Sequence, residues 1–440
     1  MRDYFFDLAQ SWERLLARDE VGLLNFAGES SDFCRLNGAK VRQIGLVIHY
    51  RMQLRLVKGR KHTALQLTLC GEADQDRERM RTALTQLRSS LAMLPDDPYL
   101  ILNQIPQSSE TMQANRLPAL EEWTDSIRTA AQGLDLVGFF AAGGLYRGFA
   151  NSLGQRNWFE NYSFNFDWSL YHQGDKAVKS QYGGFDWDQQ VLAAKMSAAR
   201  EQLAVLRQPV RRIEPGTYRV YLAPAALHEI MSLLQWRSFG IKNQRTKASP
   251  ISHLVSGESQ LSPEIFLSED VANGLAPDFD SFGFRKPPQL RLIHEGRHVG
   301  ALVSARSGAE YGLLPSGSSE DEQPESLALE GGQLQASQVL KELDQGLYIN
   351  NLWYMNFSDS TSCRMTGMTR FACFWVEQGH IVQPIEVMRF DDSLYRILGE
   401  HLVGLTEDTE MIPSHSTYEA RSTDSCRLPG ALIKEMRLTL

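Results

Sequence analysis

The sequence predicts an α+β fold in two domains, and three patterns support this expectation. Apolar residues at helical spacing recur in the first half of the chain, between stretches in which apolar and polar residues alternate. Strand-type alternation dominates from about Leu290 onward. A chain of 440 residues is longer than a domain with a single hydrophobic core usually is. We therefore expect a helix-flanked sheet domain at 1–208 and a mainly antiparallel sheet domain at 209–440.

The first domain is expected to open with a helix, because its first residues carry apolar side chains at helical spacing. Alternation in Phe33–Leu69, with turn signals at Asn37-Gly38 and Lys58-Gly59, predicts a meander of several short strands. Three later stretches are predicted as helices, namely Asp74–Met93, Ala119–Gln132 and Phe185–Leu206. Between them, aromatic residues alternate along Tyr162–Trp168. This pattern indicates a strand whose aromatic face packs in a core or a domain interface rather than holding a ligand.

The second domain follows a linker from Gln208 to Gly216. Tyr218–Leu222 is predicted as a strand, and Pro224 as the first residue of a helix. One face of that helix carries an apolar stripe at i, i+3, i+4 and i+7, formed by Leu227, Ile230, Met231 and Leu234. Pro315–Gly332 contains Ser, Gly and a run of acids, and is predicted as a solvated loop.

Composition argues against nucleic acid as a direct ligand, because 45 Lys plus Arg face 53 Asp plus Glu. The five cysteines are dispersed without a CxxC pair, which favours reduced thiols in a cytoplasmic protein. The first residues include acids and do not resemble an export signal. The longest uncharged apolar stretch, Leu136–Tyr146, is too short to span a bilayer. We expect a cytoplasmic protein with no membrane contact.

Residues 294–298 read His-Glu-Gly-Arg-His, the HExxH string of zinc proteases. Zinc would need both histidines on one helix face. Strand-type alternation on both sides of Glu295-Gly296 instead predicts a hairpin with a two-residue turn, in which Gly296 has positive φ. His294 would then face Arg297, and His298 would face Ile293, so the two rings point to opposite sides of the sheet. The HExxH string is therefore interpreted as a chance match that does not form a zinc site.

A second His-Glu pair, His228-Glu229, lies on the helix expected after Pro224. Four residues after His228 stands Ser232, and five residues after it stands Leu233, so neither HExxH nor HExxxH is complete. Catalytic zinc needs three protein ligands and an open position. Other ligands would have to come from distant residues such as His253 and Cys426. A single histidine on such a helix is more often packed or solvated than a ligand.

An ordered series of motifs resembles the C-terminal domain of the TldD/TldE (PmbA) family. A "GLY" strand, a T-G strand, an I-E-N-G hairpin that leads to P-I and a closing P-A-L strand match Gly346–Leu352, Thr366–Arg370, Phe374–Ile385 and Pro429–Lys434. Ile293–Gly296 occupies the place of an earlier family I-E-N-G turn, and Ser304–Arg306 matches a family S-A-R. The resemblance implies a TldD/PmbA-type fold and a hairpin at 294–298.

The family contains two kinds of subunit. TldD-type subunits carry HExxxH, use zinc and resemble peptidases that degrade unfolded or short peptides held as an added strand, whereas TldE-type subunits lack the ligands and pair with them. His228 and Glu229 match the first two motif residues, but Leu233 stands in place of the second histidine. The family's cysteine ligand is unmatched, because Cys426 precedes Pro429 by three residues and is expected in a strand. The resemblance thus implies a TldE-like chain without its own zinc.

The leading hypothesis is a cytoplasmic TldE-like subunit that dimerises with a TldD-type catalytic subunit, where the zinc resides, and helps to enclose extended peptides. Candidate peptide contacts are Thr366, Gly367 and Thr369. One alternative is an active zinc metallopeptidase with His228 as ligand, Glu229 as base and non-standard further ligands. The other is a stand-alone peptide-binding module.

Overall fold

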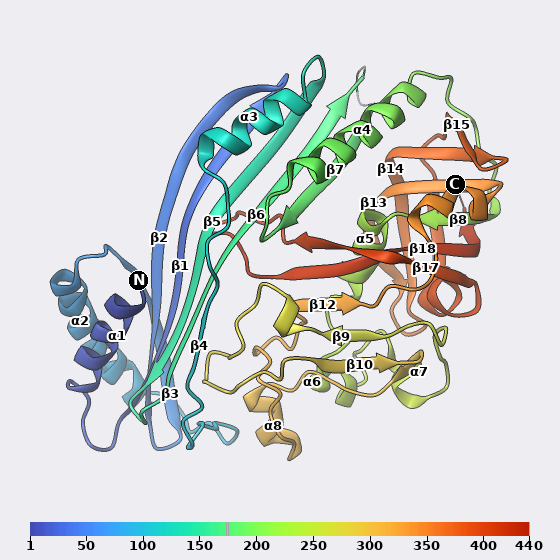
Figure 1. Ribbon diagram of the computed structural model, residues 1–440. Helices are drawn as coiled ribbons and strands as arrows, with labels where there is room; N and C mark the ends of the chain where they lie inside the picture. Colours follow the sequence, from blue (N-terminus) through green and yellow to red (C-terminus); the bar gives the residue numbers. More distant parts are fainter. Residues whose placement is uncertain (173, 175, 440) are drawn as a thin grey trace.

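The computed structural model describes residues 1–172, 174 and 176–439, and they form two packed sheets with helices (Figure 1). The elements of the first half are α1 (Arg2–Glu13), β1 (Val21–Asn37), β2 (Lys40–Lys58), β3 (Lys61–Leu69), α2 (Ala73–Ala92), β4 (Ser109–Met112), α3 (Leu120–Ala130), β5 (Asp135–Asn151), β6 (Arg156–Tyr171), β7 (Ala177–Gly184) and α4 (Gln189–Val205). Those of the second half are β8 (Gly216–Leu222), α5 (Pro224–Gln235), α6 (Ile241–Arg245), α7 (Ser252–Ser256), β9 (Leu267–Glu269), η1 (Val271–Asn273), β10 (Leu290–His294), β11 (Arg297–His298), α8 (Ala305–Tyr311), β12 (Ser326–Leu329), η2 (Ala336–Gln338), α9 (Val339–Leu343), β13 (Gly346–Asp359), β14 (Arg364–Glu377), β15 (His380–Pro384), β16 (Arg389–Ser393), η3 (Arg396–Glu400), β17 (Leu402–Pro413) and β18 (Ser425–Leu438). The predicted α+β class is confirmed.

The first sheet is a long curved layer with the strand order β3-β2-β1-β5-β6-β4, and β7 pairs with β6 (Figure 1). The expected meander of short strands is wrong in strand length and start: β1 begins at Val21, and β1 and β2 contain 17 and 19 residues. β1 stays extended through Gly28 and Ser30 because β2 and β5 pair with it on both sides there. Tertiary pairing therefore overrides residues that usually interrupt strands.

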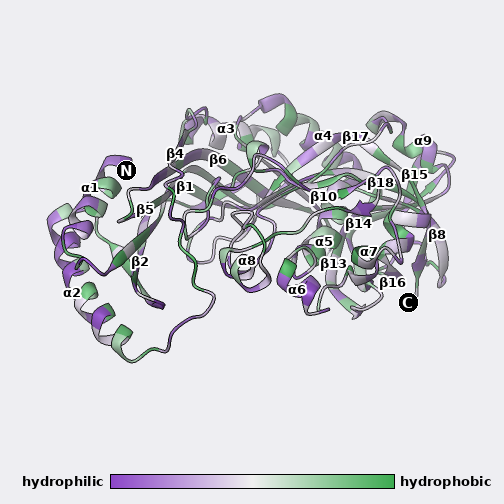
Figure 2. Cartoon of the chain, turned by 90° about the horizontal axis from the view of Figure 1, so that it is seen from below, coloured by the Kyte–Doolittle hydropathy of each residue, from purple (hydrophilic) through white to green (hydrophobic). Residues whose placement is uncertain are grey.

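The two faces of the first sheet have different neighbours. Leu24 and Phe26 pack with α1 and α2, and Cys34 and Leu36 pack with α3 and α4, so the even-numbered residues of β1 face the helices. Hydrophobic and hydrophilic residues are both visible around α1 and α2 (Figure 2), as expected of helices with one buried face. The odd-numbered residues of β1 face the second half of the chain, as Leu23 does in packing with Phe279.

The aromatic strand predicted at Tyr162–Trp168 lies within β6. Phe164 and Phe166 are fully buried, and Trp168 is nearly so, in the cluster that α3 and α4 cover. The interpretation of these rings as core packing is confirmed.

The second sheet contains a closed ring of strands. β8, β13, β14, β16 and β18 pair in that order, and β18 pairs again with β8. From β18 the sheet continues through β12, β9, β10 and β11, and β17 pairs with β18. The ring positions α5, which packs its predicted stripe against the core of the second half.

The prediction of a solvated loop at Pro315–Gly332 is wrong. Residues 326–329 form β12, and Glu322 is 2% exposed. The Glu322 carboxylate accepts hydrogen bonds from the backbone N–H and hydroxyl of Ser304 at 3.0 and 2.9 Å and from the N–H of Lys242 at 2.9 Å. Glu322 belongs to an acidic run that was expected to face solvent. Its carboxylate is instead buried, because backbone N–H groups at the starts of α6 and α8 donate hydrogen bonds to it.

Within the described residues, no helix combines the length and apolar character that a membrane crossing needs. The five cysteines are unpaired, and all but Cys70 are buried.

Candidate functional site

The candidate site is the half-buried flank of α5, where the second half of the chain meets the first sheet. Pro224 is the first residue of α5, where the helix has no hydrogen-bond acceptor for a backbone N–H, so the missing N–H of proline costs nothing. The apolar stripe from Leu227 to Leu234 is buried in the core of the second half. His228 and Glu229 are half-buried on the flank that faces the other half. The packing of the stripe therefore fixes the direction in which this pair points.

His228 lies among residues from three other parts of the chain. Its Nε2 is hydrogen-bonded to the Ser232 hydroxyl at 3.2 Å, and its ring meets the His415 ring edge to face, with centroids 6.0 Å apart. His415 Nδ1 lies 3.0 Å from Asp167 Oδ1 in β6. Burial, followed by the nearby His415 and Lys179, lowers the pKa of His228 to about 4. His228 is therefore neutral at physiological pH.

Glu229, the next residue, is also shifted by its surroundings. Burial raises the pKa of its carboxyl group, and the nearby Lys179 and His415 oppose this shift. Lys179 comes from β7, and its positive charge favours the neutral form of His228 and the ionised form of Glu229.

The donors around His228 do not fit the zinc site that the resemblance implies for TldD-type subunits. Ser232 occupies the four-residue step, and Leu233 packs against the core of the second half. The distant candidates are elsewhere engaged: His253 on α7 lies 2.7 Å from Glu258, and the buried Cys426 in β18 donates to Gln235 Oε1 at 3.6 Å. Among the described residues, no three His, Cys, Asp or Glu side chains are grouped as metal ligands.

The hairpin prediction for the HExxH string is confirmed. β10 and β11 pair with Ile293 opposite His298 and with His294 opposite Arg297. Glu295 and Gly296 form the turn with φ of 47° and 72°. Zinc therefore cannot be shared by the two histidines of this string.

Thr366, Gly367 and Thr369 lie in β14, which is paired on both sides at this level by β13 and β16. Thr366 Oγ1 donates to Phe390 O, and Thr369 Oγ1 accepts from the N–H of Met388. Their contacts with a peptide stay a prediction, but an added strand finds little unpaired backbone here. The sheet edges lie elsewhere.

The sequence did not reveal Asp167, Lys179 and His415 as neighbours of His228. They come from β6, β7 and the segment 414–424 between β17 and β18. No motif joins positions so distant in the chain, and only the packing of the two sheets brings them together.

The chain is similar to known proteins in sequence and in fold. The family model described as the PmbA/TldA metallopeptidase C-terminal domain matches residues 215–440, slightly more than half of the chain. The chain therefore belongs to the PmbA/TldD metallopeptidase family. No curated protein matches it by sequence.

Solved structures show the same fold along the full chain. TldE from Thermococcus kodakarensis superposes with a TM-score of 0.81 at 14% identity, covering 99% of this chain and 100% of that one. A "putative modulator of a DNA gyrase" from Thermotoga maritima has a TM-score of 0.77 at 13% identity, with 99% of both chains covered. A protein of the same description from Bacteroides thetaiotaomicron has a TM-score of 0.73 at 13% identity, again with 99% of both covered.

Proposed function

We propose that this chain is a TldE/PmbA-like subunit of a peptidase that degrades unfolded or short peptides, and that it pairs with a TldD-type subunit that carries the catalytic zinc. The observation that carries the proposal is Leu233, which stands where HExxxH has its second histidine and packs against the core of the second half. An aliphatic side chain replaces the imidazole that HExxxH requires, and the charge of Lys179 acts on both His228 and Glu229. This surrounding lacks the second imidazole that a zinc site of the HExxxH type requires.

The unpaired edge of β2 supports a role in subunit pairing. β2 pairs with β1 along its length, but β3 reaches it only from Tyr50 to Lys58. Residues 40–49 therefore leave one row of backbone groups free among the described residues, next to the exposed side chains Val41, Ile44, Leu46, Val47 and Ile48.

The charge of this edge indicates the kind of partner surface that it suits. Lys40, Arg42 and His49 lie in the segment, which contains no Asp or Glu. Two copies of the segment paired with each other would bring like charges together. An apolar and acidic strand of a TldD-type subunit is therefore the occupant that we propose.

The compartment and substrate follow from the same proposal. Five unpaired cysteines suit a reducing compartment, so we place the complex in the cytoplasm. Extended peptides would be enclosed between the two subunits, and this chain would contribute walls and strand edges without a metal ligand.

The test uses the full chain, alone and mixed with a TldD-type subunit that carries an intact HExxxH motif. Cleavage of an unstructured peptide is followed, with and without a chelator, and metal content is measured. We expect no chelator-sensitive cleavage by this chain alone and a chelator-sensitive activity in the co-purified mixture.

Two variants separate the subunit roles. His228→Ala in this chain should leave cleavage by the mixture within about twofold, whereas alanine in place of a motif histidine of the partner should abolish it. Cleavage by this chain alone, together with stoichiometric zinc that His228→Ala removes, would instead establish the active-metallopeptidase alternative. Recovery of a homo-oligomer that never binds a TldD-type subunit would favour the stand-alone module.

A further inference from the structure

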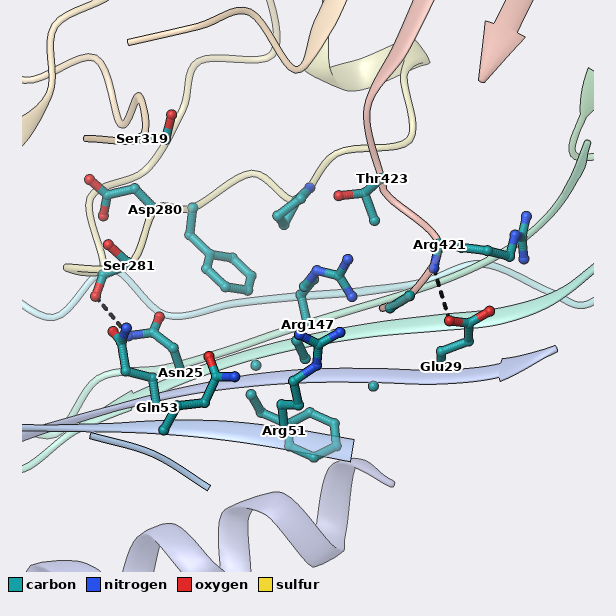
Figure 3. Close-up of a pocket in the computed structure, with 18 of the residues that line it drawn as sticks. Asn25, Glu29, Arg51, Gln53, Arg147, Asp280, Ser281, Ser319, Arg421 and Thr423 are labelled. Carbon is teal, nitrogen blue, oxygen red and sulfur yellow. Dashed lines mark hydrogen bonds between the residues drawn. The ribbon is translucent and has the colours of Figure 1, made fainter. Parts of the chain in front are cut away.

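A cavity of about 470 Å³ lies between the first sheet and loops of the second half, away from His228. Asn25, Arg51, Gln53 and Arg147 line it from the sheet, and Asp280 and Thr423 line it from the loops. Figure 3 shows Arg147 and Arg51 pointing from the strands into the space below these loops. The volume is in the range of small-molecule sites.

Arg147 is the unusual residue of this cavity. It lies in β5, between β1 and β6, and its Nη1 donates to the backbone carbonyl of Tyr146 at 2.9 Å. Within the part of the chain that the structure describes, no carboxylate lies at ion-pair distance from its guanidinium group. Burial lowers the pKa of Arg147, and more distant carboxylates oppose this shift. Arg147 is half-buried, and a guanidinium group in a cavity without a carboxylate partner is suited to bind an anionic ligand.

The acids of the cavity are engaged by other groups. Glu29 accepts from the backbone N–H of Arg421 at 2.9 Å, and Glu325 is held by Lys286 at 2.7 Å. Asp280 accepts two backbone N–H groups of the turn that follows it, and burial raises its pKa to about 7. The charges of Glu29 and Glu325 are thus already balanced or hydrogen-bonded, and Asp280 carries only part of a charge at neutral pH. Arg147 retains unused donors.

We propose that this cavity binds the oxyanion of a small ligand, a carboxylate or a phosphate, and that Arg147 is its principal binding residue. A guanidinium group offers two parallel donors to such an anion. Arg51 is a second cation; its present ion pair with Glu419 at 2.6 Å is partly exposed and can exchange for a ligand. The amide groups of Asn25 and Gln53 lie beside the same space (Figure 3). The site belongs to this chain alone and does not depend on the proposed pairing with a TldD-type subunit.

The test is titration calorimetry of the full chain with three probes: a short peptide with a free C-terminal carboxylate, the same peptide amidated at its C-terminus, and inorganic phosphate. Binding of the free acid but not the amide identifies a peptide carboxylate as the source of the anion. Binding of phosphate identifies a phosphate source. In either case Arg147→Gln should weaken binding by at least roughly tenfold, because it removes a charge-assisted bidentate contact.

Matched variants distinguish a loss of ligand binding from a loss of folding. Arg35→Gln removes the same charge from an exposed position of β1 and should change affinity less than about twofold. Arg147→Lys keeps the positive charge but not the two parallel N–H donors of the guanidinium group, so this variant should bind the ligand with intermediate affinity. If Arg147→Gln does not fold, Arg51→Gln takes its place, with a smaller expected loss. Absence of binding by all three probes at millimolar concentration, or equal binding by wild type and Arg147→Gln, would overturn the proposal.

Discussion

The backbone N–H of Arg421 donates to the Glu29 carboxylate at 2.9 Å, although 392 positions separate the two residues. The Arg421 guanidinium group enters the first sheet, where it donates to the Ser31 hydroxyl at 3.2 Å and to the Ser163 carbonyl at 2.9 Å. This contact anchors the segment that also carries His415 toward His228. One anchored loop therefore borders both the candidate site and the oxyanion cavity.

Loss of this anchor should destabilise the fold. Arg421→Met removes the buried guanidinium group while it keeps an apolar stem of similar length, and leaves the buried carbonyl and hydroxyl acceptors in the sheet unpaired. We expect a loss of about 2–4 kcal/mol in the free energy of unfolding, measured by urea denaturation. Arg35→Met, at an exposed position, should cost less than about 0.5 kcal/mol. Equal stability of the two variants would show that Arg421 does not hold the loop.

Acid should destabilise the protein through His228. Its pKa is about 4 in the folded chain, below the 6.5 of an exposed histidine. Between these values the unfolded state binds more protons, so the contribution of this group to stability is complete above about pH 6.5 and is lost as the pH falls toward 4. His228→Gln should reduce this loss. Urea midpoints of the two proteins should differ more at pH 4.5 than at pH 7, and parallel pH profiles would contradict the shift.

The turn at 294–298 can be tested by glycine substitution. An added Cβ at Gly296, with φ of 72°, would lie 2.3 Å from the carbonyl oxygen of Leu261. Gly296→Ala should therefore lower the free energy of unfolding by about 3 kcal/mol or more. Gly312, with φ of 67° and open space around it, is the matched control, and Gly312→Ala should cost about 1 kcal/mol. Stabilisation by Gly296→Ala would instead indicate a helix.

The buried carboxylate of Glu322 should matter more than its place in an acidic run indicates. Glu322→Ala leaves the donors of Ser304 and Lys242 without their acceptor, and we expect a loss of about 2–4 kcal/mol in denaturant unfolding. Glu320, two residues earlier, is exposed, and Glu320→Ala should change stability by less than about 1 kcal/mol. Similar losses for both variants would contradict a specific role of Glu322.

The edge of β2 should control association with a TldD-type subunit. Leu46 is 59% exposed, so Leu46→Lys should leave the free energy of unfolding nearly unchanged but weaken the complex by at least roughly tenfold. Leu314, 90% exposed in the segment after α8, is the control, and Leu314→Lys should bind normally. Affinity measured by biolayer interferometry checks both. A complex unaffected by Leu46→Lys would place the interface elsewhere.

Local patterns predicted those parts of the structure that neighbouring residues decide. The α5 stripe and the hairpin at 294–298 follow from the spacing of apolar residues and the turn at Glu295-Gly296. Strand lengths in the first sheet did not follow, because pairing on both sides keeps β1 extended through Gly28. Burial of Glu322 did not follow either, since its donors belong to helix starts distant in sequence.

By itself the sequence determined which donors the chain lacks: an aliphatic Leu233 follows His228 at the position where HExxxH has its second histidine, whatever the fold. Only the tertiary structure decided what surrounds that histidine instead. His415, Asp167 and Lys179 reach it from separate strands and loops because the two halves of the chain pack against each other. The same packing places Arg147 in a cavity between the first sheet and loops of the second half, since contacts between distant segments depend on the whole chain and not on local spacing.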